Sequence, residues 1–358
     1  MNILADASLP GLEKAFPLPF HLTKYNNPEE ITDLLPGQDI LFCRANLKVN
    51  KSLLKNHCLR YVATASSGTD HLDHRWLKSQ NIQIIDAKGA NARAVADYVV
   101  SCVAYLTQAQ LYQGNKIGII GLGHVGSHVA YRLHAVGFDI FKFDPLKEKK
   151  DTNHFRSCSL EELYQADLLC VHAELHDQPP YPSMNLIDKN FLNRLKPGCV
   201  LINAARGGIV NEKDLLQSPK PFIYCTDVYL NEPDIDAHII DKAILCTPHI
   251  AGHSIEAKYT AVAMVSTMLH QLTGLSLPQF FKPKINQVIH FEHDEAWIES
   301  VLKIYNPLDE TLCLKQATQK KNAFLELRKN HRNRHDFLQY ATHSNLPDKT
   351  KFMLGITN

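Results

Sequence analysis

Short apolar runs alternate with segments of helical periodicity along most of the chain. An uninterrupted apolar run is typical of a buried parallel strand, and apolar positions at three- and four-residue steps are typical of a helix packed against it. Their alternation predicts an α/β fold with doubly wound parallel sheets. We interpret the following runs as strands: Ile3–Ala5, Ile40–Cys43, Tyr61–Ala63, Ile82–Ile85, Ile117–Ile120, Ile140–Phe143, Asp167–His172, Cys199–Asn203, Phe222–Thr226 and Ile244–Cys246.

Two long helical patterns divide this series. Arg93–Gln110, rich in Ala and Val, leads directly into the strand Ile117–Ile120, and Ser254–Leu272 follows the last apolar run. We expect these helices to carry the chain from a first domain into a second one and back again. A domain inserted in this way predicts a hinge with a ligand-binding cleft beneath it.

A glycine turn follows the strand Ile117–Ile120 directly. Gly121, Gly123 and Gly126 have G-x-G-x-x-G spacing, and a helical repeat begins beside them. In such a turn the first glycine permits a tight bend, the second lets the backbone approach a pyrophosphate, and the third lets the helix pack closely on the strand. The helix N-terminus adds free N–H groups and a partial positive charge. The turn, with His124 and Val125 inside it, therefore predicts a dinucleotide site.

Asp144 indicates which dinucleotide is bound. It ends the next apolar strand, 18 residues after Gly126, close to the ~20 residues expected for the acid that holds the adenosine ribose hydroxyls. A carboxylate there would repel the additional phosphate of NADP. The sequence therefore predicts NAD as the cofactor.

Two polar turns stand out in the first domain. Arg44 directly follows one predicted strand, and Ser66–Gly68 follows another. Ligands of open α/β sheets bind at the carboxyl ends of strands, where both turns would lie. Arg44 could grip an anion, and the backbone N–H groups near Ser66–Gly68 could cradle one. From these residues alone, a solvated arginine and an ordinary Ser/Gly turn remain an open alternative.

Three ionisable residues follow successive strands in the second half of the chain. Arg206, Glu232 and His249 each lie just past a predicted strand. A histidine can take the hydroxyl proton of an alcohol as hydride leaves carbon, and a carboxylate can orient its ring. An arginine fork can hold a substrate carboxylate. Singly, these residues could be a capping Arg, a surface Glu and a core His; together they predict hydride transfer at a hydroxy acid.

The charge balance argues against polyanionic partners. Lys and Arg number 38 and Asp and Glu 37, which gives a net charge of +1 among 358 residues. Bulk charge therefore indicates neither nucleic acid nor an anionic membrane. The 19 histidines are scattered without metal-ligand spacing, so we expect no metal site.

Cysteine usage and the absence of targeting signals favour the cytoplasm. The nine cysteines are odd in number and include no C-x-x-C pair, so reduced core thiols are expected. The first residues lack the basic and apolar regions of a signal peptide. No apolar stretch reaches the ~18 residues of a transmembrane helix.

The last part of the chain is more polar. Lys315–Arg334 is rich in Lys and Arg, and Phe324, Leu327 and Leu338 give the last part of the chain a partial helical stripe. A basic nucleic-acid patch is one interpretation. A solvated helix face is favoured, because acidic residues between positions 292 and 310 precede the stretch and balance its charge.

Four motifs occur along the chain in this order: GLGHVG, NAARGGIV, DVYLNEP and TPHIAG. On these motifs, residues 1–285 show a specific resemblance to the D-isomer-specific 2-hydroxyacid dehydrogenases. The resemblance implies that Arg206, Glu232 and His249 are catalytic: His249 as the acid/base, Glu232 as its partner and Arg206 as the carboxylate binder. It also implies NAD contacts from the following residues, in addition to those of the glycine turn: Asp144, Ala173, Ala204, Ala205, Arg206, Asp227 and Gly252.

Further motifs resemble members of that family that oxidise 4-phospho-D-erythronate at C2 in vitamin B6 biosynthesis. They are ILADASLP, CRANLKVNKSLL, VATASSGTDHLD, PPYPSMNLID and YNPLDETLCLK. A small phosphorylated 2-hydroxy acid is therefore the expected substrate. The alternatives are another D-2-hydroxyacid dehydrogenase, of 3-phosphoglycerate or glyoxylate/hydroxypyruvate type, and a non-catalytic NAD-sensing protein. The resemblance implies substrate contacts from Arg44, Ala45, Ser66, Ser67, Gly68 and His253.

Four of these positions depart from the family pattern. Ala45 and Ser66 stand where Ser and Thr are expected, His253 where Tyr is expected, and Ala173 where a Thr would face the cofactor.

Three domains follow from the patterns and the resemblance. We expect a flavodoxin-like substrate-binding domain over 1–92 and 256–283, and a Rossmann-type NAD-binding domain over 93–255 inserted into it. Pro278–Pro283 is typical of a linker. Residues 284–358 are expected to form a small α/β domain through which the chain makes a homodimer.

Overall fold

The computed structural model describes residues 1–279, 289–292, 295–331, 334–341 and 346–356. The chain packs into two compact units. The first, here the N-terminal unit, comprises residues 1–91 and 254–284, and the second, the nucleotide unit, comprises residues 92–253 and 285–358. The tail thus packs with the nucleotide unit. Its standing as a separate domain, and the three predicted boundaries, stay predictions. The predicted linker Pro278–Pro283 lies mostly outside the described residues.

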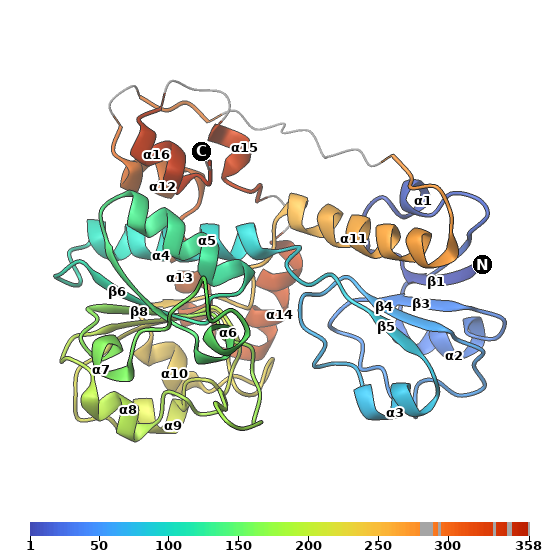
Figure 1. The fold of residues 1–358 in the computed structure, drawn as a ribbon, viewed down its shortest axis with the longest axis horizontal. Coiled ribbons are helices and arrows are strands. Elements are labelled where there is room, and N and C mark those ends of the chain that lie inside the picture. Colours follow the sequence, from blue (N-terminus) through green and yellow to red (C-terminus); the bar gives the residue numbers. More distant parts are fainter. Residues whose placement is uncertain (280–288, 293–294, 332–333, 342–345, 357–358) are drawn as a thin grey trace. The chain divides into compact units, whose positions relative to one another are not determined.

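A parallel sheet forms the centre of the N-terminal unit (Figure 1). Its described strands have the order β2-β1-β3-β4-β5. Their bounds are β1 (Asn2–Asp6), β2 (His21–Tyr25), β3 (Ile40–Cys43), β4 (Tyr61–Thr64) and β5 (Gln83–Ile85). Strand β2 was not predicted. It lies at the sheet edge, and only Tyr25 among its residues is fully buried, so it carries no apolar run.

Helices cover both faces of this sheet. Ile3 and Ala5 of β1 point into a core closed by α1 and α11, whereas Leu4 points into the core on the opposite face. The Ser266 hydroxyl of α11 donates a hydrogen bond to the Ala15 carbonyl of α1 at 2.6 Å. The helices are α1 (Leu12–Ala15), the 3-10 helix η1 (Pro28–Glu30), α2 (Ile31–Leu34), α3 (His74–Ser79) and α11 (Ile255–Thr273).

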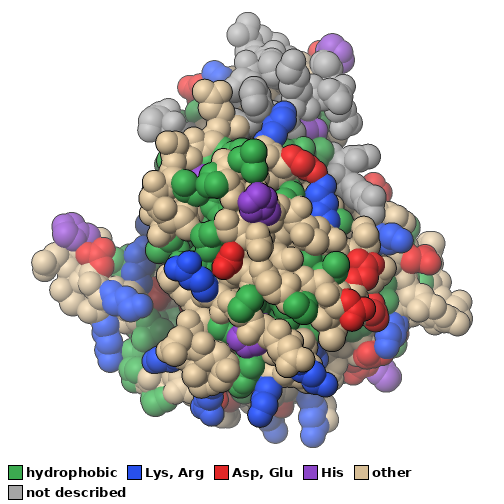
Figure 2. Space-filling model, turned by 90° about the vertical axis from the view of Figure 1, so that its right-hand side faces the viewer, with side chains coloured by type: hydrophobic (Ala, Val, Ile, Leu, Met, Phe, Trp, Pro, Cys, Tyr) green, Lys and Arg blue, Asp and Glu red, His purple; other side chains and the backbone are tan. Residues whose placement is uncertain are grey.

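Charged side chains of both signs share the molecular surface. In the face drawn in Figure 2, Lys and Arg side chains lie beside Asp and Glu side chains, with hydrophobic side chains between them. This mixture agrees with the net charge of +1. Within the described ranges, no helix is long and apolar enough to span a membrane. No group of His, Cys, Asp and Glu in the same ranges could hold a metal ion.

The nucleotide unit is built on a second parallel sheet. Its described strands have the order β11-β10-β9-β8-β6-β7. The chain leaves β6 toward β7 on one side and later returns to β8 on the other, so β6 and β8 flank a topological switch point. The bounds are β6 (Lys116–Ile120), β7 (Asp139–Phe143), β8 (Leu168–Val171), β9 (Val200–Asn203), β10 (Ile223–Thr226) and β11 (Leu245–Cys246). The predicted α/β fold with parallel sheets is confirmed.

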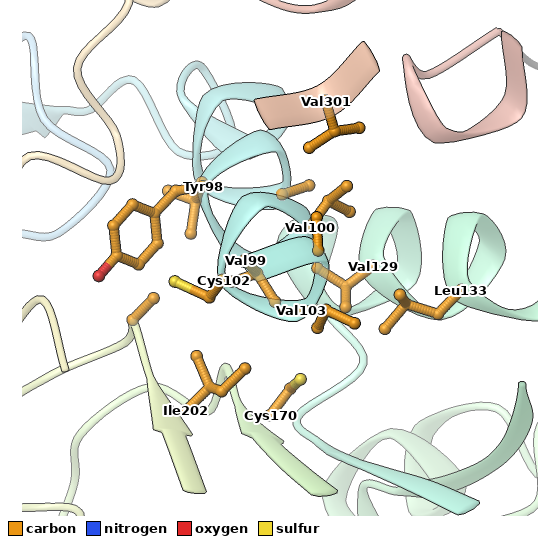
Figure 3. Packing of buried hydrophobic residues seen from close by; sticks show 14 of the residues in the cluster. Tyr98, Val99, Val100, Cys102, Val103, Val129, Leu133, Cys170, Ile202 and Val301 are labelled. Carbon is orange, nitrogen blue, oxygen red and sulfur yellow. The ribbon is translucent and has the colours of Figure 1, made fainter. Parts of the chain in front are cut away.

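Two helices cover one face of this sheet and a row of short helices covers the other. Helix α4 (Ala92–Gln108) is apolar on nearly all sides, as expected of a helix buried on all sides. Figure 3 shows α4 between the strands that carry Cys170 and Ile202 and the helix that carries Val301. The remaining helices are α5 (His124–Ala135), α6 (Pro145–Lys150), α7 (Leu160–Leu163), α8 (Lys189–Arg194), α9 (Glu212–Gln217) and α10 (Ala237–Lys242).

The tail packs onto both faces of the nucleotide unit. Val301 and Met353 join the core on the α4 face, and Leu314 and Phe324 join the core on the opposite face. The described part of the tail contains helices only, so the strands expected of a small α/β domain are not found there. The helices are α12 (Trp297–Ile304), α13 (Leu308–Gln316), α14 (Lys320–Asn330), α15 (Leu338–Ala341) and α16 (Asp348–Met353).

Candidate active site

The glycine turn has the geometry that a dinucleotide requires. Gly121 has φ +88°, and a Cβ there would lie 2.6 Å from the backbone nitrogen of Ala173. A Cβ on Gly126 would lie 1.9 Å from the Gly121 carbonyl oxygen. Gly123, the N-cap of α5, differs, because a Cβ there would meet open space, with no described atom within 4 Å beyond the adjoining backbone. The turn is thus tightly packed at Gly121 and Gly126 and open at Gly123, where a pyrophosphate would approach the helix N-terminus.

Asp144 lies beside this turn, as the sequence predicted. One carboxylate oxygen accepts a hydrogen bond from the Leu122 N–H at 2.8 Å, and the other accepts one from the Lys147 N–H at 2.8 Å. The Lys147 ammonium donates to the Leu122 carbonyl at 2.9 Å. These contacts fix the carboxylate at the rim of the turn, where its remaining lone pairs could accept ribose hydroxyls. Its contact with the ribose stays a prediction.

Alanine substitutions at two glycines separate cofactor binding from folding. Gly123→Ala should fold normally, because the added methyl meets open space, and should weaken NAD binding by about tenfold, or roughly 1.4 kcal/mol, because the methyl occupies the phosphate approach. Gly126→Ala should instead destabilise the fold by about 1–3 kcal/mol through overpacking. Isothermal titration with NAD and thermal unfolding measure the two effects. Equal NAD affinity in wild type and Gly123→Ala would contradict the assignment.

His249 and Glu232, the predicted acid/base and its partner, lie in hydrogen-bond contact, and their catalytic roles stay predictions. The Nδ1 atom of His249 lies 2.6 Å from Glu232 Oε2, and Glu232 Oε1 accepts the Tyr229 N–H at 2.9 Å. Burial raises the pKa of the Glu232 carboxyl, but the His249 charge and hydrogen bond and the Tyr229 N–H outweigh it, so the net pKa is lowered. Glu232 therefore stays ionised beside the imidazole.

His249 is held in an unusual backbone conformation. Its φ of +55° lies in the left-handed region, which costs a residue with a side chain on the order of 1–3 kcal/mol. Both Asp227 oxygens hold the residues that follow, since Oδ1 accepts the Ile250 N–H at 2.8 Å and Oδ2 accepts the Ala251 N–H at 2.9 Å. The Thr247 hydroxyl adds a bond to Asp227 at 2.7 Å. Asp227 thus positions the histidine loop, and its predicted contact with NAD stays a prediction.

Arg206 lies on a third loop that converges on this pair. Its turn follows β9, and the Asn203 side chain closes it by accepting the Ala205 N–H at 3.2 Å and donating to the Arg206 carbonyl at 3.1 Å. A Cβ on Gly207 would lie 1.9 Å from the Tyr229 carbonyl oxygen, so the arginine turn packs directly on the loop that carries Glu232. Ala204 and Ala205 are buried beneath it.

The predicted residues of the N-terminal unit lie at the carboxyl ends of neighbouring strands. Arg44 and Ala45 follow β3, and Ser66–Gly68 follow β4, which pairs with β3. The Ser67 hydroxyl donates to the Asn91 side-chain oxygen at 2.6 Å. Arg44, Ala45 and Asn46 are exposed at the carboxyl end of β3. The structure thus gathers these residues, while their substrate contacts stay predictions.

A cavity of about 260 Å³ opens beside Arg44. The Arg44 Nε donates to Asp6 Oδ2 at 3.0 Å, and both residues line the cavity. The Tyr25 hydroxyl has no hydrogen-bond partner among the described residues, although the side chain is 2% exposed. Sequence reasoning missed Tyr25 because it ends the unpredicted strand β2. Polar residues that line the cavity are Asp6, Ser8, Tyr25, Asn26, Arg44 and Asn46.

His253, the remaining predicted substrate residue, lies in the nucleotide unit next to the tail. Its N–H donates to the Ile250 carbonyl at 2.8 Å. Its ring centroid lies 6.4 Å from that of His331, and Arg334 donates to its carbonyl at 3.2 Å. Arg334 ends the basic stretch predicted to be a solvated helix face. That prediction is wrong for this residue, which is only 8% exposed. The sequence carries no signal for its burial.

Comparisons with known proteins identify the family of the nucleotide unit. Residues 96–251 match the family model described as D-isomer specific 2-hydroxyacid dehydrogenase, NAD binding domain. This range holds the glycine turn, Asp144 and all three catalytic candidates. NAD, the cofactor predicted from the turn and Asp144, is thereby confirmed.

Relatives extend the similarity over nearly the whole chain. The chain is 58% identical over 340 residues to a protein of Legionella pneumophila named erythronate-4-phosphate dehydrogenase, covering 95% of this chain and 96% of that one. A Coxiella burnetii protein of the same name is 39% identical over 268 residues, covering 74% and 72%.

Solved structures support the fold. The D-lactate dehydrogenase of Aquifex aeolicus, solved with NAD and lactic acid, matches with a TM-score of 0.61 at 19% identity, covering 76% of this chain and 96% of that one. The relatives and the family model together lead to one conclusion. The chain belongs to the erythronate-4-phosphate dehydrogenases, within the D-isomer specific 2-hydroxyacid dehydrogenase family.

Proposed function

We propose that this chain oxidises 4-phospho-D-erythronate at C2 to (R)-3-hydroxy-2-oxo-4-phosphobutanoate, with NAD as hydride acceptor, as a step of pyridoxal 5'-phosphate biosynthesis. The observation that carries the proposal is the Glu232–His249 pair, 2.6 Å apart, on the nucleotide unit that also holds Arg206 and the glycine turn. The name shared by relatives up to 58% identical supplies the substrate.

The pair supplies the base that the oxidation needs. Because His249 directs Nδ1 at Glu232, its Nε2 is the atom available to take the proton of the C2 hydroxyl. The C2–H bond breaks with its electron pair as the C=O bond forms. Ionised Glu232 stabilises the imidazolium that results. Bound NAD supplies the acceptor for the hydride.

Arg206 holds the other end of the reacting centre. Its guanidinium is suited to a substrate carboxylate, which it can bind through two parallel hydrogen bonds. In this role it orients C2 and polarises the C2 oxygen as the carbonyl forms. Asn203 supports it by fixing the turn from which the side chain extends.

The cavity beside Arg44 is proposed as the phosphate site. It offers a guanidinium, the buried Tyr25 hydroxyl and the side chains of Asn26 and Asn46. Burial, then the nearby Cys43 and Asp6, raise the pKa of Tyr25, so its phenol stays protonated and can donate to a phosphate oxygen. A cation paired with a phosphate makes a strong charge-assisted hydrogen bond.

Arg44→Ala should therefore act on the phosphorylated substrate alone. Loss of a hydrogen bond to a charged group costs about 1.5–3 kcal/mol, so KM for 4-phospho-D-erythronate should rise about 10- to 100-fold. KM for unphosphorylated D-erythronate should stay unchanged. Arg60→Ala is a matched control, since Arg60 directly precedes β4 at the opposite, amino end of the same sheet. An equal rise for both substrates would contradict a phosphate role.

A panel of hydroxy acids tests the function itself. NADH formation should be much faster with 4-phospho-D-erythronate than with 3-phosphoglycerate, glycolate or D-glycerate. Preference for one of the other acids would reassign the chain within the family. Tight NAD binding without turnover of any acid would favour an NAD-sensing role.

We further propose a homodimer in the cytoplasm, with residues 284–358 as the dimerisation domain. Leu312 of α13 and Leu325 of α14 are exposed, which supports a contact surface on the tail. All nine cysteines lie in described segments and are free thiols, which supports a reducing compartment. Sedimentation equilibrium of the full chain reports the oligomeric state.

A further inference from the structure

The loop that carries His249 is contacted by a residue far along the chain. Arg334 is 8% exposed and makes several hydrogen bonds to the backbone just after His249. Its Nε donates to the His253 carbonyl at 3.2 Å, and its Nη2 donates to the carbonyls of Ile250 and Ala251. A further bond from Nη2 to the Ala94 carbonyl, at 3.2 Å, ties the same guanidinium to α4.

Arg334 and Asp227 bind opposite backbone groups of the same two residues. Asp227 accepts the N–H groups of Ile250 and Ala251, and Arg334 donates to the carbonyls of these same two residues. The left-handed φ of His249 directly precedes this doubly held segment. A strained conformation persists only where its surroundings over-determine it. We infer that Arg334 is a positioning residue, which acts through the loop to keep His249 in register with Glu232.

The surroundings of Arg334 favour this role over that of an ordinary ion pair. Its guanidinium stacks 4.8 Å from the centroid of the Tyr305 ring, and its Nη1 has no partner among the described residues. The buried carboxylate in its neighbourhood, Asp97, is bonded instead by Arg132 and by the Phe337 N–H. A buried cation is costly without partners, and the partners of this one are chiefly the carbonyls of the histidine loop.

A simple anchor for the tail is the competing explanation. The tail is also anchored by apolar side chains in the core on the α4 face, independently of the Arg334 hydrogen bonds. Phe337 and Met353 are fully buried in the core on the α4 face. Phe337→Leu therefore loosens the tail while leaving every hydrogen bond to residues 250–253 in place, which makes it a matched control for a structural effect.

The test compares kcat with thermal stability in the full-length protein. It rests on the proposed function, because kcat is measured with 4-phospho-D-erythronate and NAD. Arg334→Met should lower kcat on the order of 100-fold, as expected for a misplaced catalytic group, and Arg334→Lys should recover part of the loss. Phe337→Leu should lower Tm with kcat near the wild-type value.

Chemical rescue supplies a readout that a structural role would not move. Arg334→Ala leaves a guanidinium-sized space at the loop carbonyls, so millimolar guanidinium should restore part of its lost kcat and should leave the near-normal kcat of Phe337→Leu unchanged. Wild-type kcat in Arg334→Met, or a loss in Arg334→Ala that guanidinium does not relieve, would overturn the inference. Absence of turnover in the wild-type protein would instead overturn the proposed function, so the two failures are distinguishable.

Discussion

Replacing His249 with alanine is expected to lower kcat for 4-phospho-D-erythronate by about 10³-fold, the usual size of a general-base contribution. In the proposed reaction the imidazole takes the C2 hydroxyl proton, and Glu232, whose pKa is lowered beside it, would stabilise the charged ring. Titration of NADH fluorescence should show cofactor affinity close to wild type, because the glycine turn and Asp144 are untouched.

A histidine–aspartate pair on the surface provides the control. His238 lies 2.9 Å from Asp236, much as His249 lies beside Glu232, but its side chain is 83% exposed. His238→Ala should leave kcat unchanged. Near-normal turnover of His249→Ala, or an equal loss in both variants, would show that another group takes the proton.

Replacing Arg132 with methionine should destabilise the nucleotide unit by about 3–5 kcal/mol, because it leaves one partner of a buried ion pair uncompensated. Arg132 of α5 pairs with Asp97 of α4, and each side chain is 1% exposed. Asp97 also accepts the Phe337 N–H at 2.9 Å, so the pair holds the tail against both helices. Urea unfolding followed by Trp297, which lies on α12, measures the loss in a Trp76→Phe background.

The double variant and a surface pair test the cause of that loss. Asp97→Leu combined with Arg132→Met removes both charges and should be more stable than Arg132→Met alone. Arg194→Met, which breaks a pair with Glu161 exposed by 53% and 68%, should cost less than about 1 kcal/mol. If the double variant is no more stable than Arg132→Met, the stability loss comes from packing and not from an unpaired charge.

The pH dependence of Arg132→Met has a definite sign. Burial raises the pKa of Asp97 even with Arg132 present. A carboxyl whose folded pKa is raised favours the folded state when it is protonated. Removing Arg132 takes away a charge and a hydrogen bond that lower this pKa, so Asp97 should take up its proton at a higher pH in Arg132→Met than in the wild type. The destabilisation should therefore shrink as the pH falls, and a loss that grows toward acid would contradict an uncompensated Asp97 charge as its cause.

The buried strands were predictable from sequence because both faces of a parallel sheet are covered. Ile40–Cys43 is an apolar run with the bounds of β3. The edge strand β2 is half exposed and was missed, and with it the Tyr25 hydroxyl of the cavity. A half-exposed edge strand carries too few apolar residues to be distinguished from a loop by its sequence.

The convergence of the candidate residues was predictable because each follows a strand in a recognisable motif, and parallel strands end at one edge. Glu232 and His249 do meet. Arg334 was not predictable, because its partners are backbone carbonyls, and a carbonyl leaves no trace in the residue type. The left-handed φ of His249 and the loop contacts of Asp227 are likewise properties of backbone geometry.

Deuterium transfer from substrate to cofactor tests hydride transfer from C2 to NAD most directly. The full-length protein is incubated with 4-phospho-D-erythronate deuterated at C2 and with NAD, and the reduced cofactor is analysed by mass spectrometry. The account predicts that each NADH formed carries one deuterium, that the product is the 2-oxo acid and that single-turnover hydride transfer slows with a primary isotope effect. Unlabelled NADH, or retention of the deuterium in the product, would contradict oxidation at C2.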